Sequence, residues 1–207
     1  MRALGGAAAA LIAVVIGAMG ASPPGSASER FDTGPSTAWV VGDSITYQGE
    51  ETLRQELRAD VSGSISIDGV PGRSVADLDD LVASELTTEA DPDVMVLALG
   101  SNPSPVWRRG DYRSVVESIP DTTVVVLVTV YRTDVSEGPV VARRMAAYSR
   151  WMREIAAGRS NVCLAKWRAA VKPDPQRLLF DGVHPNDQGQ QVWAGLIRSA
   201  VERCSQP

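Results

Sequence analysis

The sequence predicts an α/β protein, a three-layer α/β/α sandwich of flavodoxin-like outline with about five parallel strands and helices on both faces. Two observations point to this fold class. Several segments are apolar on consecutive residues, as in 94–99, and strands of that kind are buried on both faces of a parallel sheet. Segments with helical spacing alternate with these runs, which is the order of strands joined by right-handed crossovers.

The elements follow one another in a regular order. The first strand, 38–41, ends in a glycine turn and leads to a helix over 50–59, whose two initial glutamates suit the positive end of the helix dipole. Each later strand is likewise followed by a helix. The later strands are expected at 64–67, 94–99, 123–130 and 162–167, and the helices that follow them at 75–88, 112–118, 140–157 and 187–203.

The first 27 residues predict a secretory signal peptide. A cationic start at Arg2 precedes an apolar run over 3–21, and small residues offer cleavage sites near 20–27. An uncleaved membrane anchor is the alternative, because the run is nearly long enough to span a bilayer. Cleavage is favoured because the Ala and Gly residues make the apolar run only weakly hydrophobic. Residues 28–36 would then be a linker and 37–207 the single domain, secreted and without stable membrane insertion.

Charge and cysteine content narrow the partners and the compartment. The chain has a net charge of −5 and scattered basic residues, so no nucleic-acid partner is expected. Cys163 lies early in the fifth strand, and Cys204 lies at the end of the last helix, which should run back antiparallel to that strand. We therefore expect a disulfide that closes a loop of about 40 residues and stabilises the fold by roughly 3–4 kcal/mol.

The only histidine of the chain, His184, follows Asp181 by three residues and directly precedes Pro185. Imidazole titrates near neutral pH, and a neighbouring carboxylate fixes its tautomer and stabilises its charged form. A lone histidine on a turn is more often a surface or capping residue. The pair therefore indicates acid–base chemistry only if further reactive groups meet it.

Such groups occur at the ends of three other strands. Ser44 follows the first strand at the mouth of a helix, Gly72 lies in the loop after the second, and Asn102 follows the third. They could supply a nucleophile and oxyanion donors, while each alone is explained by a helix cap or a turn. Because the carboxyl ends of parallel strands share one edge, the set together favours acyl transfer.

These segments resemble the conserved blocks of the SGNH hydrolases, also called the GDSL-like lipase/esterase family, from about Ala38 to Arg203. The resemblance implies Ser44 as nucleophile, His184 as base and Asp181 as its partner. It also implies an oxyanion hole made of the Ser44 and Gly72 N–H groups and the Asn102 side chain. The matching segments are Gly42-Asp43-Ser44, Gly72, Gly100-Ser101-Asn102 and Asp181-Gly182-Val183-His184-Pro185.

One residue departs from the family pattern. Asn102 is followed by Pro103 where the family usually has an aspartate, and a proline restricts the residue before it to extended backbone. The aim of the Asn102 side chain is therefore open. Related domains that transfer acetyl groups to cell-wall sugars also vary in this block.

Other candidate residues carry less weight. Trp107 and Tyr131, on loops after the third and fourth strands, are expected to line a substrate cleft. Asp43, Asp68, Asp134 and Asp174 could gather at the same edge, but without paired-ligand motifs no metal and no other cofactor is expected. The remaining tryptophans, Trp39, Trp151, Trp167 and Trp193, suit core packing.

The sequence thus predicts a secreted, monomeric serine esterase that hydrolyses short-chain acyl esters of small molecules, lipids or carbohydrates, by way of an acyl-enzyme. Two alternatives remain open. An O-acyltransferase would use the same residues and hand the acyl group to a cell-wall or other carbohydrate. A non-catalytic binding module on the same fold is the second alternative, motivated by Pro103.

Overall fold

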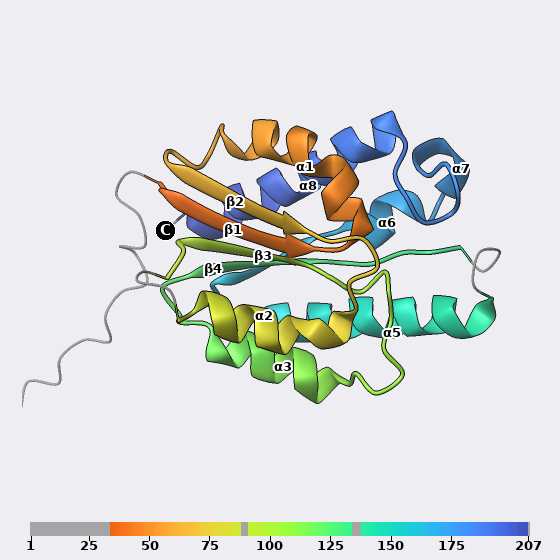
Figure 1. Ribbon diagram of the computed structural model, residues 1–207, viewed down its shortest axis with the longest axis horizontal. Coiled ribbons are helices and arrows are strands. Elements are labelled where there is room, and N and C mark those ends of the chain that lie inside the picture. Colours follow the sequence, from red (N-terminus) through yellow and green to blue (C-terminus); the bar gives the residue numbers. More distant parts are fainter. Residues whose placement is uncertain (1–33, 88–90, 134–137, 207) are drawn as a thin grey trace, which may run out of the picture.

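The computed structural model describes residues 34–87, 91–133 and 138–206, and these contain a five-stranded parallel sheet with the strand order β2-β1-β3-β4-β5 (Figure 1). This is the flavodoxin-like order, so the predicted fold class is confirmed. The order reverses between β1 and β3, and crevices for ligands form beyond the carboxyl ends of strands at such a point. The strands are β1 (Thr37–Gly42), β2 (Ser64–Gly69), β3 (Val94–Ala98), β4 (Val124–Val128) and β5 (Val162–Ala165).

Helices cover both faces of the sheet. Figure 1 shows α1 and α8 on one face and α2, α3 and α5 on the other. Two short helices, α6 and α7, lie at the carboxyl end of the sheet, and a 3₁₀ turn, Val75–Asp77, leads into α2. The helices are α1 (Ser44–Leu57), α2 (Leu78–Glu85), α3 (Arg109–Ser118), α5 (Pro139–Ala156), α6 (Trp167–Val171), α7 (Pro175–Leu178) and α8 (Asp187–Ser205).

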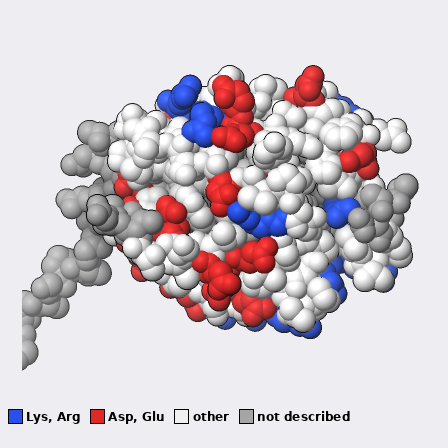
Figure 2. Space-filling model, viewed as in Figure 1, with Lys and Arg blue, Asp and Glu red and all other residues white. Residues whose placement is uncertain are grey.

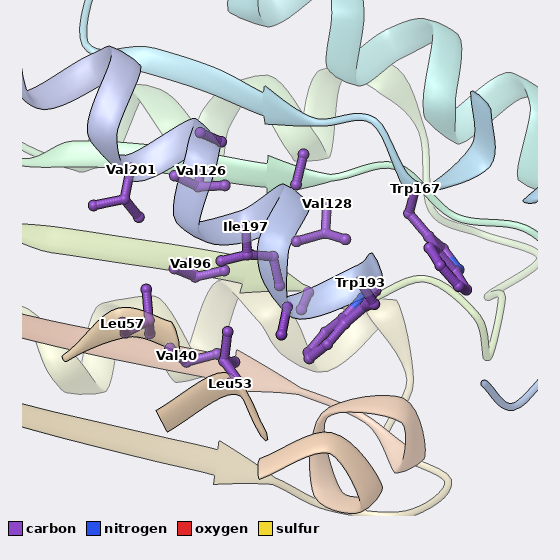
Figure 3. Close-up of a cluster of buried hydrophobic side chains, with 14 of the residues drawn as sticks. Val40, Leu53, Leu57, Val96, Val126, Val128, Trp167, Trp193, Ile197 and Val201 are labelled. Atoms are coloured by element: carbon purple, nitrogen blue, oxygen red, sulfur yellow. The ribbon is translucent and has the colours of Figure 1, made fainter. Parts of the chain in front are cut away.

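The central strands carry apolar residues toward both layers of helices. On the α1/α8 side, Val40 and Val96 of the sheet pack against Leu53, Trp193 and Ile197, all at most 2 % exposed (Figure 3). Alternate residues of the same strands enter a second cluster beneath α2, α3 and α5. Burial on both faces explains why these strands are apolar on consecutive residues.

The expected disulfide is present. Cys163 of β5 and Cys204 in the last turn of α8 are bonded, with a sequence separation of 41 residues. Both cysteines lie toward the amino ends of the strands, because α8 runs back along the sheet. The bond therefore fastens the C-terminal helix at the edge opposite to the one that carries the candidate site.

Three expectations about the elements need correction or fall outside the described residues. The fifth strand ends at Ala165, so Trp167 begins a helix instead of ending a strand, although its ring is buried as expected. The helix expected from Glu50 begins at Ser44, because Asp43 caps it. The expected signal peptide, residues 1–27, and Asp134 lie outside the described residues. Within the described ranges, no helix is both long and apolar enough to cross a membrane.

Candidate active site

Ser44 lies at the junction of β1 and α1 and is the first residue of α1. The Asp43 carboxylate accepts a hydrogen bond from the backbone N–H of Ile45 at 3.0 Å and so starts the helix directly after the strand. Gly42 makes room for this tight turn, since a Cβ there would lie 1.8 Å from the Thr46 hydroxyl oxygen. The half-buried Ser44 is consequently held at the carboxyl edge of the sheet.

A continuous chain of hydrogen bonds joins Ser44 to the histidine loop. Ser44 Oγ lies 2.9 Å from His184 Nε2, and His184 Nδ1 lies 2.6 Å from Asp181 Oδ2. With the carboxylate accepting from Nδ1–H, Nε2 is left as the acceptor for the serine proton. This geometry suits a nucleophile, its base and the group that orients the base.

The backbone around Asp181 is arranged to hold this carboxylate ionised. Its other oxygen accepts the N–H groups of Val183 at 2.9 Å and His184 at 2.8 Å. Partial burial works to raise the pKa of Asp181, but the bonds from the His184 backbone and ring and from Val183 outweigh it and hold the pKa below its usual value. Asp181 is therefore a negative partner for an imidazolium throughout the neutral range.

The loop that carries His184 is held by hydrogen bonds within the loop and by a bond from the segment that follows β4. The N–H of Thr133 donates to the Gly182 carbonyl at 3.0 Å, and the N–H of Phe180 donates to the His184 carbonyl at 3.1 Å. Gly182 has φ +86°, and a Cβ there would come within 2.5 Å of the Thr133 hydroxyl oxygen, so glycine is required twice over. This fixes the position of the imidazole although two short helices separate its loop from β5.

The expected oxyanion donors lie in the loops after β2 and β3, which are joined to each other. Asn102 Nδ2 donates to the Arg73 carbonyl at 3.1 Å, and the Asn102 carbonyl accepts the N–H of Val75 at 3.2 Å. An amide nitrogen carries two N–H groups, so one can bind Arg73 while the other serves an oxyanion. The side chain is thus directed at the β2 loop in spite of Pro103. Gly72, with φ +80°, precedes Arg73 in that loop.

A buried contact that the sequence did not reveal joins the residue before Ser44 to the loop after β3. The Ser101 hydroxyl donates to the Asp43 carboxylate, and both side chains are at most 2 % exposed. Burial raises the pKa of Asp43, while bonds from Ser101 and the N–H of Ile45 work against that rise. Because Asp43 precedes Ser44 and Ser101 precedes Asn102, this contact fixes the two candidate residues relative to each other.

The sequence did not indicate that Arg73 links neighbouring strands. Its guanidinium donates to the carbonyls of Gly42 at 3.3 Å and Asp68 at 2.8 Å, and it pairs with the Asp68 carboxylate at 3.0 Å. It therefore links the ends of β1 and β2 beneath the loop that holds Gly72. Its position directly after Gly72 in the sequence was the only available signal.

The aromatic residues expected in a cleft are placed differently from one another. Trp107 is only 7 % exposed and packs edge-on against Tyr112 in the core, so its expected part in an open cleft is corrected to packing. Tyr131 is half-buried and lines a surface hollow beside Arg132. An aromatic residue that was not foreseen, Phe180, is 63 % exposed and lies stacked beside the His184 ring at 5.7 Å.

The acidic candidates that lie among the described residues, Asp43, Asp68 and Asp174, do not assemble into a metal site. Within residues 34–87, 91–133 and 138–206, no three His, Cys, Asp or Glu side chains come together as metal ligands would. Asp43 is engaged by Ser101, Asp68 by Arg73, and Asp174 precedes α7. The polar groups that do converge are those suited to acyl transfer.

Comparison with known proteins identifies the family of the chain. The family model of the GDSL-like lipase/acylhydrolases matches residues 40–192. No curated protein matches the sequence significantly.

Several solved structures share the fold. The C-terminal catalytic domain of Streptococcus pneumoniae peptidoglycan O-acetyltransferase A superposes with a TM-score of 0.69 at 22 % identity, covering 82 % of this chain and 94 % of that one. A lipolytic G-D-S-L family protein of Veillonella parvula gives 0.63 at 17 % identity, covering 80 % and 98 %. An acetyl xylan esterase of Geobacillus stearothermophilus gives 0.61 at 21 %, covering 84 % and 97 %. At these identities the likeness concerns the fold.

Proposed function

Because the chain belongs to the GDSL-like lipase/acylhydrolase family, we propose that it is an exported serine esterase that hydrolyses short-chain acyl esters with Ser44, His184 and Asp181. Membership of the family makes it an ester-acting enzyme. The observation that carries the finer assignment is the hydrogen-bond chain from Asp181 through His184 to Ser44, with distances of 2.6 and 2.9 Å.

The reaction follows from the positions of these atoms. His184 Nε2 takes the proton of Ser44 as Oγ attacks the ester carbonyl carbon, and the imidazolium is stabilised by Asp181. The N–H groups of Ser44 and Gly72 and the side chain of Asn102 donate to the tetrahedral oxyanion. The imidazolium then protonates the leaving alcohol. Water, deprotonated by His184, releases the acyl group from Ser44 in the same way.

Two further observations support parts of the proposal. The Cys163–Cys204 disulfide suits an oxidising compartment and thus supports export. Two of the solved structures that share the fold are named for acetyl chemistry, a peptidoglycan O-acetyltransferase and an acetyl xylan esterase. Acetyl and other short acyl groups, carried on carbohydrates or small alcohols, are therefore the substrates we propose first.

The decisive test replaces Ser44 with Ala and follows p-nitrophenyl acetate hydrolysis. We expect turnover to fall to the background level with an unchanged circular dichroism spectrum. Ser114→Ala is the matched control, because Ser114 is an exposed serine on α3, and it should keep wild-type activity. Retained activity in the Ser44→Ala variant would refute the assignment.

The second candidate function is acyl transfer to a carbohydrate hydroxyl. It is favoured by the superposition on the peptidoglycan O-acetyltransferase domain, whose TM-score of 0.69 exceeds the 0.61 of the acetyl xylan esterase. The same three residues would form the acyl-enzyme, and a sugar hydroxyl would replace water. Mass spectrometry of products formed with an acyl donor and an oligosaccharide acceptor distinguishes the two, since only transfer yields an acylated sugar.

A further inference from the structure

A basic hollow lies beside the candidate active site, at the carboxyl ends of β4 and β5. It has a volume of about 340 Å³ between α5 and α6, and its lining includes Arg132, Arg143, Arg168 and Lys172. An adjoining hollow of about 300 Å³ shares Arg168 and Lys172. The second hollow adds two further cations, Arg153 and Lys166.

The charge of this region is opposite to that of the chain as a whole. The chain carries −5, yet none of the described residues that line the two hollows is acidic. In the space-filling view, acidic side chains gather below the centre of the visible face, and basic ones lie at its upper left, at its centre and toward the end where the strands finish (Figure 2). The sequence places two carboxylates nearby, Asp134 and Glu137, and the six cations outnumber them.

Two of these cations, Arg143 and Lys172, have none of the carboxylate partners that other arginines of the described residues have. Arg54, Arg159 and Arg198 form ion pairs at 3.0 Å or less. By contrast, no acidic side chain among the described residues pairs with Arg143 or Lys172, which are both exposed. Like charges gathered in a hollow repel one another, and an anionic ligand would relieve that repulsion.

Two hydrogen bonds connect the loop beside the hollow to residues that adjoin the candidate site. Arg132 donates to the Ser101 carbonyl at 3.0 Å, directly before Asn102. Thr133, the next residue, donates its N–H to Gly182, directly after Asp181. In the sheet, β4 is two strands from β1, which carries Ser44 at its end, a separation of about 10 Å at about 4.8 Å per strand. A ligand could therefore reach both places at once.

The chemistry of the wall suits anionic groups on a chain. Arg168 lies over the Tyr131 ring at 5.5 Å, which holds this guanidinium at the wall. Guanidinium groups match the geometry of carboxylate and phosphate oxygens, and exposed lysines add point charges. Because the two adjoining hollows share Arg168 and Lys172, together they could bind more than one anionic group.

We propose that the basic hollow is an anion-binding subsite, and that the esters cleaved at Ser44 are borne on an acidic polymer whose carboxylate or phosphate groups bind there. The second clause rests on the proposed function, whereas the binding of polyanions does not. Bound in this way, the polymer is positioned by charge on one side of Ser44, while its acyl group enters the oxyanion site.

The test uses a charge-reversed variant, Arg143→Glu with Lys172→Glu, which leaves the reacting groups untouched. The matched control is Arg58→Glu with Arg113→Glu, because these arginines are exposed, lie outside both hollows and change the net charge equally. Acetyl release is measured from acetylated polygalacturonate and from neutral acetylated xylan. We expect the hollow variant to lose about tenfold or more in kcat/KM on polygalacturonate relative to the control pair. Turnover of p-nitrophenyl acetate and acetylated xylan should differ less than twofold between the two.

Binding is measured separately, so that it does not depend on catalysis. The Ser44→Ala protein is titrated with unacetylated polygalacturonate, with polyphosphate and with neutral xylan at about 50 and 200 mM salt. We expect salt-sensitive binding of a polyanion that the Arg143/Lys172 variant weakens at least tenfold. Tighter polygalacturonate binding identifies carboxylates as the anion, and tighter polyphosphate binding identifies phosphates. Polyanion binding without any esterase activity of the wild type would leave the subsite standing and remove the proposed function. Equal behaviour of the hollow variant and the control pair, or no polyanion binding, overturns the subsite.

Discussion

Replacing Asp181 with Asn tests how much the orienting carboxylate contributes. The asparagine Oδ1 can still accept the N–H groups of Val183 and His184, which now bind Asp181 Oδ1 at 2.9 and 2.8 Å, so the loop should keep its shape. However, the amide nitrogen of the asparagine would direct its N–H groups at His184 Nδ1. The imidazole then favours the tautomer that carries its proton on Nε2, which cannot accept from Ser44.

Two contributions set the expected loss. In the reactive tautomer, the Nδ1–H of His184 would point at the N–H groups of the asparagine amide. The hydrogen bond between the two side chains would then be lost, which costs about 1–3 kcal/mol. Losing the negative charge removes about 4 kcal/mol of imidazolium stabilisation for charges about 4 Å apart in a dielectric of about 20. We take half of that value, about 2 kcal/mol, because the Asp181 side chain is 40 % exposed and solvent screens it. The total of about 3–5 kcal/mol predicts a fall in kcat of roughly 150- to 5,000-fold.

The assay is steady-state hydrolysis of p-nitrophenyl acetate, with thermal unfolding followed by circular dichroism. Asp80→Asn provides the matched control, since Asp80 is exposed on α2 far along the chain from the reacting groups. We expect the melting temperature of the Asp181→Asn variant to stay within a few degrees of the wild-type value. A fall in kcat of less than tenfold with an intact fold would refute the argument that this carboxylate sets the tautomer and stabilises the imidazolium.

Three further predictions concern the oxyanion site, the disulfide and acid stability. Asn102→Ala should lower kcat for the same ester by about 10²–10³-fold with little change in KM, because the donor acts mainly on the developing oxyanion; an unchanged kcat would remove Asn102 from that role. Replacing both Cys163 and Cys204 with Ser should lower the free energy of unfolding by roughly 3–4 kcal/mol in urea titrations, as the 41-residue separation implies, whereas a loss below about 1 kcal/mol would contradict the estimate. Partial burial works to raise the pKa of Asp93, but bonds from Ser36 and Thr37 outweigh it and lower this pKa from its usual 3.8. The ionised Asp93 therefore adds to the free energy of unfolding above about pH 4, and this contribution is lost as pH falls through the folded-state pKa. The Asp93→Asn variant should accordingly lose less free energy of unfolding than the wild type when the pH is lowered below about 4. An equal loss in both proteins would contradict this.

The fold was accessible from the sequence because buried parallel strands have a strong signature. The runs at β3 and β4 are apolar without interruption, and their alternation with helical segments left few other topologies. The position of Trp167 was less accessible. An apolar tryptophan after a strand suits a fifth-strand end as well as the start of a short helix, and only packing against α8 and its neighbours decides between them.

The site residues were recognisable one by one, while the contacts that align them were not. Ser44 and His184 are 140 residues apart, and nothing local in the sequence sets the 2.9 Å between their side chains. The Asp43–Ser101 contact depends in the same way on β1 and β3 being neighbours in the sheet. Local chemistry suggested a cleft position for Trp107, but tertiary packing placed it in the core.

The central claim is that Ser44 is a nucleophile activated by His184, and covalent labelling tests it most directly. The protein is treated with a fluorophosphonate, digested and analysed by mass spectrometry, beside the Ser44→Ala and His184→Ala variants. We predict one adduct on the peptide that contains Ser44, none in the Ser44→Ala variant and strongly slowed labelling in the His184→Ala variant. An unlabelled wild-type protein, or an adduct on another serine, would contradict the account and favour a binding module on the same fold.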